Sequence, residues 1–344
     1  MWFGRTADEG EDSMRLGFIG YGDAARAVAK GISGEGSSGT MKAWSRSIIK
    51  NEEPDENGVI CAGSREELIR DSDVIFVMVP GPAAVMCAEA SAEFLDGTKL
   101  YVDLCTGSPH DMKLVEEIIM STGARFADGA MMDTVPKYQH KVPITLCGKD
   151  GAEAEKIMTG LGMQVTYLGK EPGKADAVKL LRSMYTKAHL ACAFEMLEAA
   201  EHYGVADFVM EGLAKTMDDK TFTEGMDGRC AGGVIHASRR AHELDSAAQM
   251  LEEDGLPAYV SRAGARKLRE IGELDIRSNL THGKPKTWQE AMEYVRERKE
   301  AAENTGKPEK TGEDAGNQKE TMEMSESRES MNYPGRRKET GEIK

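Results

Sequence analysis

Strand-length apolar segments alternate with amphipathic ones over the first half of the chain. The segments that we expect to form strands lie at 16–19, 39–47, 73–79, 100–104 and 125–133, and helical patterns lie at 64–70 and 110–121. The run at 73–79, DVIFVMV, is almost wholly apolar, as in a parallel strand that is covered on both faces. Alternation of this kind predicts a doubly wound α/β sheet. A helix at 152–161 and the strand that follows it extend the pattern to about residue 169.

The pattern becomes helical from residue 173 to about residue 300. Apolar residues recur every three to four positions over 175–203, which predicts one long helix. Gly204 follows at the position where a glycine commonly ends a helix. Further helices are expected at 207–217, 233–254, 260–271 and 287–302. The chain is therefore expected to place an all-helical C-terminal domain after the α/β sheet.

Four segments follow from these patterns. Met14 stands directly before the first strand, so residues 1–13 are expected to be an N-terminal extension. Residues 14–172 form the α/β domain and residues 173–303 the helical domain, which would carry substrate-binding and dimerisation surfaces. Residues 304–344 contain almost no branched aliphatic residues, and such a segment cannot bury enough surface to offset its ordering entropy, so we expect a disordered tail.

A glycine-rich turn joins the first strand to the first helix. The segment LGFIGYGDAA at 16–25 has Gly20 and Gly22 one residue apart and Ala25 at the position of a third glycine. In a dinucleotide-binding turn the first glycine makes the bend, the second lets the backbone approach a pyrophosphate, and the helix N-terminus offers N–H groups to the phosphates. We therefore expect a Rossmann-type fold that binds its cofactor through Gly20, Tyr21, Gly22, Asp23, Ala24 and Ala25; a purely structural turn is the alternative.

The second strand indicates which cofactor is preferred. An NAD-specific site places an acidic side chain at the end of this strand to bind the ribose 2′-hydroxyl, but this chain has Ser45 and Arg46 there. A hydroxyl and a guanidinium suit a 2′-phosphate, so NADP is expected, with NAD possible as the second cofactor. For Arg46 a solvated loop position is the alternative. Val79 and Pro80 follow a strand at the sheet edge where ligands bind and are further expected cofactor contacts.

Charge and composition exclude several classes of partner. The formal net charge of −15 argues against nucleic acid or an anionic membrane surface. The six cysteines are scattered, and no His, Cys, Asp or Glu set has metal-ligand spacing, so we expect neither a metal nor a disulfide framework. An acidic, polar N-terminus and the lack of a membrane-length apolar run favour a cytoplasmic protein.

The segments LGFIGYGDAA, VIFVMVP, YVDLCTGSP and GKADAVKLLRS together resemble the β-hydroxyacid dehydrogenases, the family of 3-hydroxyisobutyrate and 6-phosphogluconate dehydrogenase. The resemblance covers about 14–273. It implies that Lys179, six residues after Gly173, is the catalytic acid/base, with Ala175 in place of a second glycine. The segment 236–274 resembles a poorly characterised subgroup with a phosphogluconate dehydrogenase-like C-terminal domain.

The resemblance also implies where a substrate would bind, with departures from the family's residues. The family holds a carboxylate with Ser-Gly-Gly, where this chain has Met132, Asp133 and Thr134, and it orients the substrate with an asparagine, where this chain has Ser183. A serine keeps a hydrogen-bonding group one turn along the same helical face as Lys179.

Two residues outside that motif are also candidates. Thr106 lies at a strand's carboxyl end, within reach of the nicotinamide ribose or the substrate, and Ser108 beside it is a helix N-cap candidate because Pro109 follows. His140 lies in a loop before Pro143 and is an expected substrate contact, with a surface position as the alternative. A solvated helix-start lysine is the alternative for Lys179.

These observations predict an NADP-dependent oxidoreductase that transfers a hydride between the nicotinamide and a small hydroxy acid, phosphorylated or not. An imine reductase on the same scaffold is the first alternative, disfavoured by Lys179 because such enzymes usually lack the lysine. A cofactor-binding protein without turnover is the other. Apolar residues on more than one face of the long helix predict a homodimer through the C-terminal helices.

Overall fold

The computed structural model describes residues 14–36, 39–47, 50–51 and 53–305. The predicted N-terminal extension and residues 306–344 of the predicted tail lie outside the described residues. The chain divides into two compact units, Met1–Leu213 with Ser246–Ala263 and Ala214–Asp245 with Gly264–Lys344. The division at residues 172 and 303 that the sequence suggests stays a prediction.

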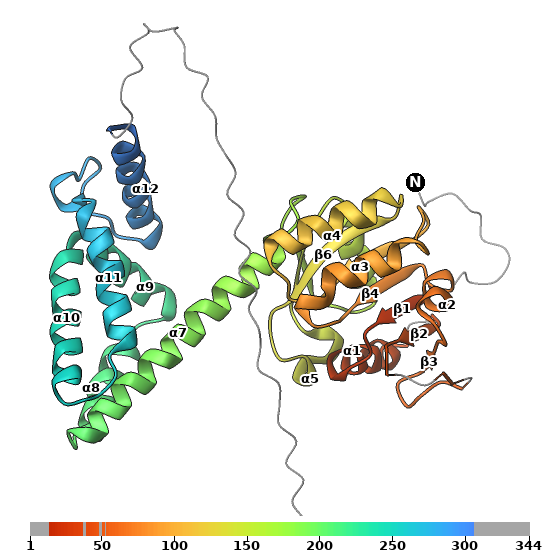
Figure 1. Cartoon of the computed structure of the whole chain (residues 1–344), viewed down its shortest axis with the longest axis horizontal. Coiled ribbons are helices and arrows are strands. Elements are labelled where there is room, and N and C mark those ends of the chain that lie inside the picture. The colour runs from red at the N-terminus through yellow and green to blue at the C-terminus, as the bar shows by residue number, and fades with distance from the viewer. Residues whose placement is uncertain (1–13, 37–38, 48–49, 52, 306–344) are drawn as a thin grey trace, which may run out of the picture. The chain divides into compact units, whose positions relative to one another are not determined.

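An eight-stranded sheet forms the centre of the first unit (Figure 1). Its spatial order is β3-β2-β1-β4-β5-β6-β7-β8, and every neighbouring pair is parallel except β6 and β7. The strands are β1 (Leu16–Ile19), β2 (Met41–Trp44), β3 (Val59–Cys61), β4 (Val74–Val77), β5 (Leu100–Asp103), β6 (Arg125–Met131), β7 (Ile144–Cys147) and β8 (Val165–Tyr167). The predicted doubly wound α/β sheet is confirmed. The three-residue β3 was not anticipated.

Six α-helices accompany the sheet among the described residues before 173. They are α1 (Asp23–Gly34), α2 (Arg65–Arg70), α3 (Ala84–Ala92), α4 (Pro109–Ser121), α5 (Val135–Tyr138) and α6 (Gly151–Gly160), with short 3₁₀ turns at η1 (Gly81–Ala83) and η2 (Gln139–Lys141). Helix α3 was not expected, since its alanine-rich sequence lacks an amphipathic pattern and follows two prolines.

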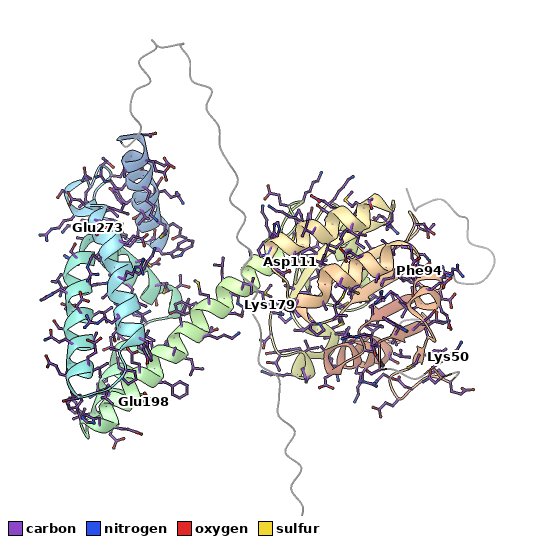
Figure 2. The ribbon with its side chains drawn as sticks, viewed as in Figure 1. Lys50, Phe94, Asp111, Lys179, Glu198 and Glu273 are labelled. Atoms are coloured by element: carbon purple, nitrogen blue, oxygen red, sulfur yellow. The ribbon has the colours of Figure 1, made fainter. Side chains whose placement is uncertain are left out.

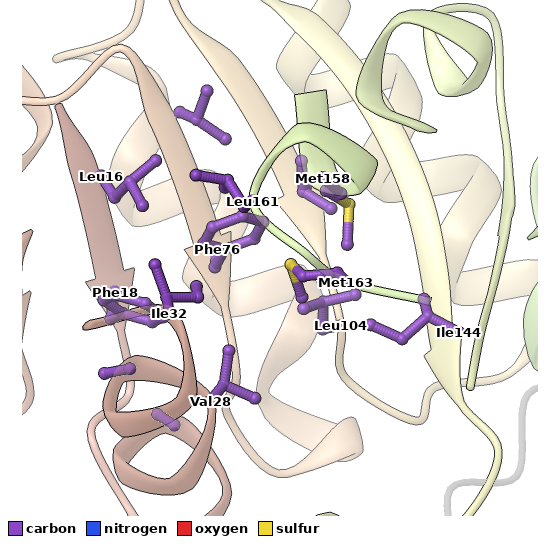
Figure 3. Packing of buried hydrophobic residues seen from close by; sticks show 14 of the residues in the cluster. Leu16, Phe18, Val28, Ile32, Phe76, Leu104, Ile144, Met158, Leu161 and Met163 are labelled. Atoms are coloured by element: carbon purple, nitrogen blue, oxygen red, sulfur yellow. The ribbon is translucent and has the colours of Figure 1, made fainter. Parts of the chain in front are cut away.

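Apolar side chains pack on both faces of the sheet. In β1, Leu16 and Phe18 join Val28 and Ile32 of α1 in one cluster, whereas Ile19 joins the cluster on the other face. Helices α1 and α6 cover the first face, as the close view of that cluster shows in part (Figure 3), and α2, α3 and α4 contribute to the second. Strands buried on both faces explain why β1 and β4 are continuous apolar runs.

The remaining α-helices are α7 (Lys174–His202), α8 (Ala206–Met217), α9 (Phe222–Ile235), α10 (Ala237–Glu253), α11 (Tyr259–Glu273) and α12 (Trp288–Thr305), with a 3₁₀ turn η3 at Ile276–Ser278. Within the first unit, Ala199 of α7 packs with Ala248, Leu251 and Ala258. Within the second, Val234, Ile276, Ala291, Tyr294 and Val295 form a core. The predicted all-helical C-terminal region is confirmed.

One predicted helix is wrong. The pattern over 233–254 suggested a single helix, but α9 ends at Ile235 and α10 begins at Ala237, with the break at His236. The start of α9 escaped detection because four glycines lie within it, which is unusual for a helix interior. Among the described residues, no helix combines the length and apolar character that crossing a membrane requires.

Candidate functional site

The turn after β1 has the shape that a pyrophosphate requires. Gly20 has a φ of +88°, and a Cβ added there would lie 2.5 Å from the carbonyl oxygen of Met78, so a side chain is excluded. Gly22 is the N-cap of α1, makes no side-chain cap, and a Cβ added there would meet nothing within 4 Å. The space beside Gly22 at the start of α1 is therefore open, and the turn fits a dinucleotide phosphate.

The side chains of this turn have separate tasks. Tyr21 is buried, its hydroxyl donates to Asp55 at 2.8 Å, and the Arg26 guanidinium lies 4.5 Å from its ring centre. Burial, followed by the hydrogen bond to Asp55, raises the pKa of Tyr21. Ala25 is buried against β1, and Ala24 is partly buried beside it. The side chain of Tyr21 therefore holds the turn in place. The backbone of Tyr21 and Gly22 is left to contact a phosphate.

Asp23 is the residue of this turn whose charge disfavours the binding of a phosphate. It is exposed in the first turn of α1, where its carboxylate adds negative charge beside the expected phosphates. Exposure to water weakens that repulsion.

Ser45 and Arg46 follow β2 directly beside the glycine turn. The Gly20 N–H donates to the Trp44 carbonyl at 2.9 Å, which ties the end of β2 to the turn. Arg46 is exposed and has no ion pair with any residue that the structure describes. Its guanidinium is therefore available to a 2′-phosphate at this end of the sheet.

The loops after β4 and β5 touch one another. The Val79 N–H donates to the Cys105 sulfur at 3.3 Å, and a Cβ added at Gly81 would lie 1.8 Å from the Thr106 carbonyl oxygen. Val79 is partly exposed and Pro80 is exposed. The backbone contacts from Gly20 to Met78 and from Gly81 to Thr106 make one continuous edge at the carboxyl ends of β1, β4 and β5, where ligands of open parallel sheets bind.

Lys179 meets this edge from the first turns of α7 (Figure 2). Its Nζ donates to Thr106 Oγ1 at 2.6 Å, and the side chain is partly buried. Burial lowers the pKa of Lys179, while the Asp176 carboxyl group acts in the opposite direction. The helix start is held in place by the Gly173 N–H, which donates to Asp128 at 2.6 Å. As expected, Ser108 caps α4 in a capping box with Asp111.

A pocket of about 320 Å³ opens beside Lys179. It is lined by Met131, Met132, Asp133, Lys179, Arg182, Ser183 and Thr186. Three of the predicted site residues, Lys179, Ser183 and Asp133, are thus brought together, and Thr106 joins them through its bond to Lys179. Their roles in substrate binding stay predictions.

Arg182 is the lining residue that the sequence interpretation missed. It lies three positions after Lys179 on the same helical face, and that spacing could have identified it. Its guanidinium donates to the Met132 carbonyl at 3.1 Å, which links α7 to the loop after β6.

Besides Thr106, two predicted substrate residues are not among these lining residues. Thr134 is exposed at the N-cap of α5, and its N–H donates to Asp133. His140 is buried, its Nε2 lies 3.5 Å from Glu35, and a Cβ added at Gly31 of α1 would meet its ring. The structure therefore gives His140 a packing position against α1, and the geometry offers no support for a substrate contact there.

Titratable groups elsewhere do not form a metal site. Among the described residues, no group of three or more His, Cys, Asp or Glu side chains could hold a metal ion. The six cysteines are all free; Cys61, Cys87, Cys105 and Cys147 are buried, Cys230 is partly buried and Cys192 is exposed.

Family models match two parts of the chain. Residues 15–107 match the family described as NADP oxidoreductase coenzyme F420-dependent, and residues 200–271 match a domain of unknown function, DUF1932. An uncharacterized 28.5 kDa protein of Methanothermus fervidus is 25% identical over 260 residues, which cover 76% of this chain and all of that protein. The mitochondrial 3-hydroxyisobutyrate dehydrogenase of Drosophila melanogaster is 25% identical over 240 residues, which cover 65% of this chain and 67% of that enzyme.

Solved structures share the fold. An imine reductase from Myxococcus stipitatus in complex with NADP+ has a TM-score of 0.62 and 18% identity, covering 82% of this chain and 99% of that chain. A variant of that enzyme in complex with NAD+ has a TM-score of 0.63 with the same identity and coverage. The chain therefore joins an NAD(P)-binding Rossmann domain to a helical C-terminal region that contains the DUF1932 domain, on an oxidoreductase scaffold with distant similarity to the β-hydroxyacid dehydrogenases.

Proposed function

We propose that this protein is an NADP-dependent oxidoreductase that acts on a small β-hydroxy acid, with or without a phosphate group, and uses Lys179 as general acid/base. The observation that supports this most strongly is the position of Lys179. Its amine lies at the carboxyl edge of the sheet, bonded to Thr106 and lining a pocket of about 320 Å³. A base for the hydroxyl proton must lie beside the cofactor-binding edge, and Lys179 is the lining residue whose bond to Thr106 holds it there.

Three of the lining residues, together with Thr106, have a task in the proposed reaction. When bound, the nicotinamide supplies the hydride acceptor or donor. Lys179 in its neutral form takes the proton of the substrate hydroxyl during oxidation, and its ammonium returns that proton during reduction. Thr106 holds the amine in place through its hydroxyl oxygen. Ser183 and Arg182 offer a hydroxyl and a guanidinium to the substrate, and the guanidinium suits a carboxylate or phosphate group.

The preference for NADP rests on Ser45 and Arg46. Both follow the end of β2 that is bonded to Gly20, and Arg46 carries a guanidinium without an ion pair among the described residues. A charge-assisted bond to a 2′-phosphate would use that guanidinium.

A homodimer is the expected assembly. Helix α7 exposes Leu181 and Phe194 by 59% and 58%, and Leu180, Met184, Tyr185 and Leu190 are also exposed. An apolar surface of this size on one helix is typical of an interface. We propose that a second copy of the chain covers it.

An imine reductase is the second candidate. It is favoured by the likeness in fold to the Myxococcus stipitatus enzyme. Lys179 disfavours this candidate, because imine reductases on this scaffold usually lack such a lysine. A protein that binds NADP without turnover is the remaining alternative.

Two measurements separate the candidates. Fluorescence of NADPH titrated with the purified full-length chain reports binding. A panel of β-hydroxy acids with NADP+, and a parallel panel of cyclic imines with NADPH, reports turnover by absorbance of the reduced cofactor. Oxidation of a hydroxy acid supports the proposal, and reduction of imines alone favours the second candidate. Tight binding of NADPH without turnover in either panel contradicts both enzymatic functions.

A further inference from the structure

The first turn of α7 contains a carboxyl group that the proposed reaction does not use. Asp176 is fully buried, with an exposed fraction of 0%. Neither of its carboxyl oxygens has a hydrogen bond of good geometry among the described residues, although the Gly107 amide favours its ionised form. It lies three positions before Lys179, so the two side chains share one face of the helix.

The surroundings of Asp176 are mostly acidic. Asp103 at the end of β5 and Asp128 in β6 are also fully buried, and each has one oxygen without a partner. A Cβ added at Gly107 would lie 3.8 Å from Asp176 Oδ2, so the loop after β5 covers the carboxyl group. Lys179 is the cation that acts on it. Lys179 itself is also influenced by the Cys105 thiol and by Lys187 of α7.

Burying such a group costs free energy. A buried polar group without a good partner destabilises a folded protein. The N–H groups at the start of α7 offset part of this cost when the carboxyl group is ionised. Burial first, then the charges of Asp128 and Asp103, raise the pKa of Asp176 to about 8, against the influence of Lys179 and the Gly107 amide. Among the described residues, the Gly107 amide is the hydrogen-bonding group that acts on this carboxyl group.

We propose that Asp176 is a positioning residue for Lys179, whose buried carboxyl group, once ionised, holds the Lys179 amine in the charged form that proton donation needs. This inference rests on the proposed function, because the charge matters only if Lys179 exchanges a proton with the substrate. Above about pH 8 the carboxyl group ionises and favours the ammonium of Lys179. The neighbouring carboxyl groups Asp103 and Asp128 act on Asp176, in the same direction as its burial.

The test replaces the carboxyl group with an amide of the same shape. Asp176→Asn removes the negative charge and should lower the pKa of Lys179 by about one pH unit, the usual effect of one nearby opposite charge. The protonation of Lys179 is measured in the full-length protein by trace acetylation with acetic anhydride over a pH series, with the modified peptide quantified by mass spectrometry. Asp176→Ala repeats the test should the amide variant fail to fold, and circular dichroism checks both.

A matched control lies on the same turn. Glu171 is exposed and pairs with Lys174 at 2.8 Å, which raises the pKa of Lys174. Glu171→Gln should therefore lower the acetylation midpoint of Lys174 and leave that of Lys179 unchanged. A midpoint of Lys179 that stays the same or rises in both Asp176 variants overturns the inference.

Turnover gives the second readout. If the proposed function holds, the pH at which oxidation reaches half its maximum falls with the acetylation midpoint in Asp176→Asn. If the acetylation midpoint falls but the pH profile of oxidation does not move, Asp176 still controls the charge of Lys179. That result would refute the proposed role of Lys179 as the base. The two failures are thus distinguishable.

Discussion

Replacing Lys179 with alanine tests the proposed chemistry directly. The change removes the amine that donates to Thr106 and that lines the pocket, but it leaves the backbone of α7 intact. One positioned acid/base is worth about two to four decades of turnover, or about 3 to 5 kcal/mol of transition-state free energy. We therefore expect kcat to fall by that factor. The Kd for NADP should hardly change, because phosphate binding depends on the Gly20–Gly22 turn at the end of β1.

The assay measures kcat and KM with the best substrate of the hydroxy-acid panel, and NADPH binding by fluorescence. Lys174→Ala is the matched control, since Lys174 is exposed in the same helical turn and pairs with Glu171. Lys179→Arg should be nearly as inactive as the alanine variant, because a guanidinium keeps its proton at working pH. Wild-type oxidation should increase as pH rises through the pKa of Lys179, which burial lowers from its ordinary 10.5, since the base must be neutral. Turnover by Lys179→Ala within a factor of a few of the wild type would refute the assignment.

Four further predictions follow from other parts of the structure. Arg46→Ala should weaken NADP binding about tenfold or more and leave NAD binding unchanged, since a charge-assisted bond contributes about 1.5 to 3 kcal/mol; equal losses for both cofactors in a binding titration would contradict this. Gly81→Ala should lower the free energy of unfolding, measured by urea denaturation, by about 1 to 3 kcal/mol, because its Cβ would lie 1.8 Å from the Thr106 carbonyl oxygen. Gly212→Ala is the control: a Cβ there meets nothing within 4 Å, so this change should be neutral or stabilising. Burial raises the pKa of Asp103 to about 7 and of Asp176 to about 8, from the ordinary 3.8. Between pH 4 and 8 the folded state therefore binds more protons than the unfolded state, so the melting temperature should fall as pH rises over that range. Asp103→Asn should make the melting temperature measured by calorimetry depend less on pH. Light scattering should give the mass of a dimer, and Phe194→Glu should shift it toward the monomer; a monomeric wild type at micromolar concentration would refute the proposed interface.

Local signals account for the parts of the site that the sequence predicts well. The Gly20–Ala25 turn, the N-cap at Ser108 and the position of Lys179 in a helix depend on residues within a few positions of one another. Such short-range features can be recognised from the amino-acid sequence alone. The apolar runs of β1 and β4 likewise report that both faces of the sheet are covered.

Tertiary contacts account for the parts that it does not predict. Asp103 and Asp176 are ordinary acidic residues in the sequence, and their burial depends on β5 and α7 meeting at one edge. His140 is buried because η2 packs on α1, and no local pattern indicates that contact. The break at His236 was missed because apolar periodicity continues across it.

The order of the strands has a consequence for synthesis of the chain. Leu16 of β1 pairs with Met41 of β2 and with Val74 of β4, partners that lie 25 and 58 residues further along. Contacts between residues so far apart in the sequence form late in folding, since the intervening loop must close before the contacts can stabilise the fold. On a ribosome, the glycine turn therefore emerges well before Met78, whose carbonyl lies against Gly20 in the finished turn. Nascent chains that end before β4 should fail to retain a dinucleotide, so the cofactor becomes a reporter of how far the sheet has assembled.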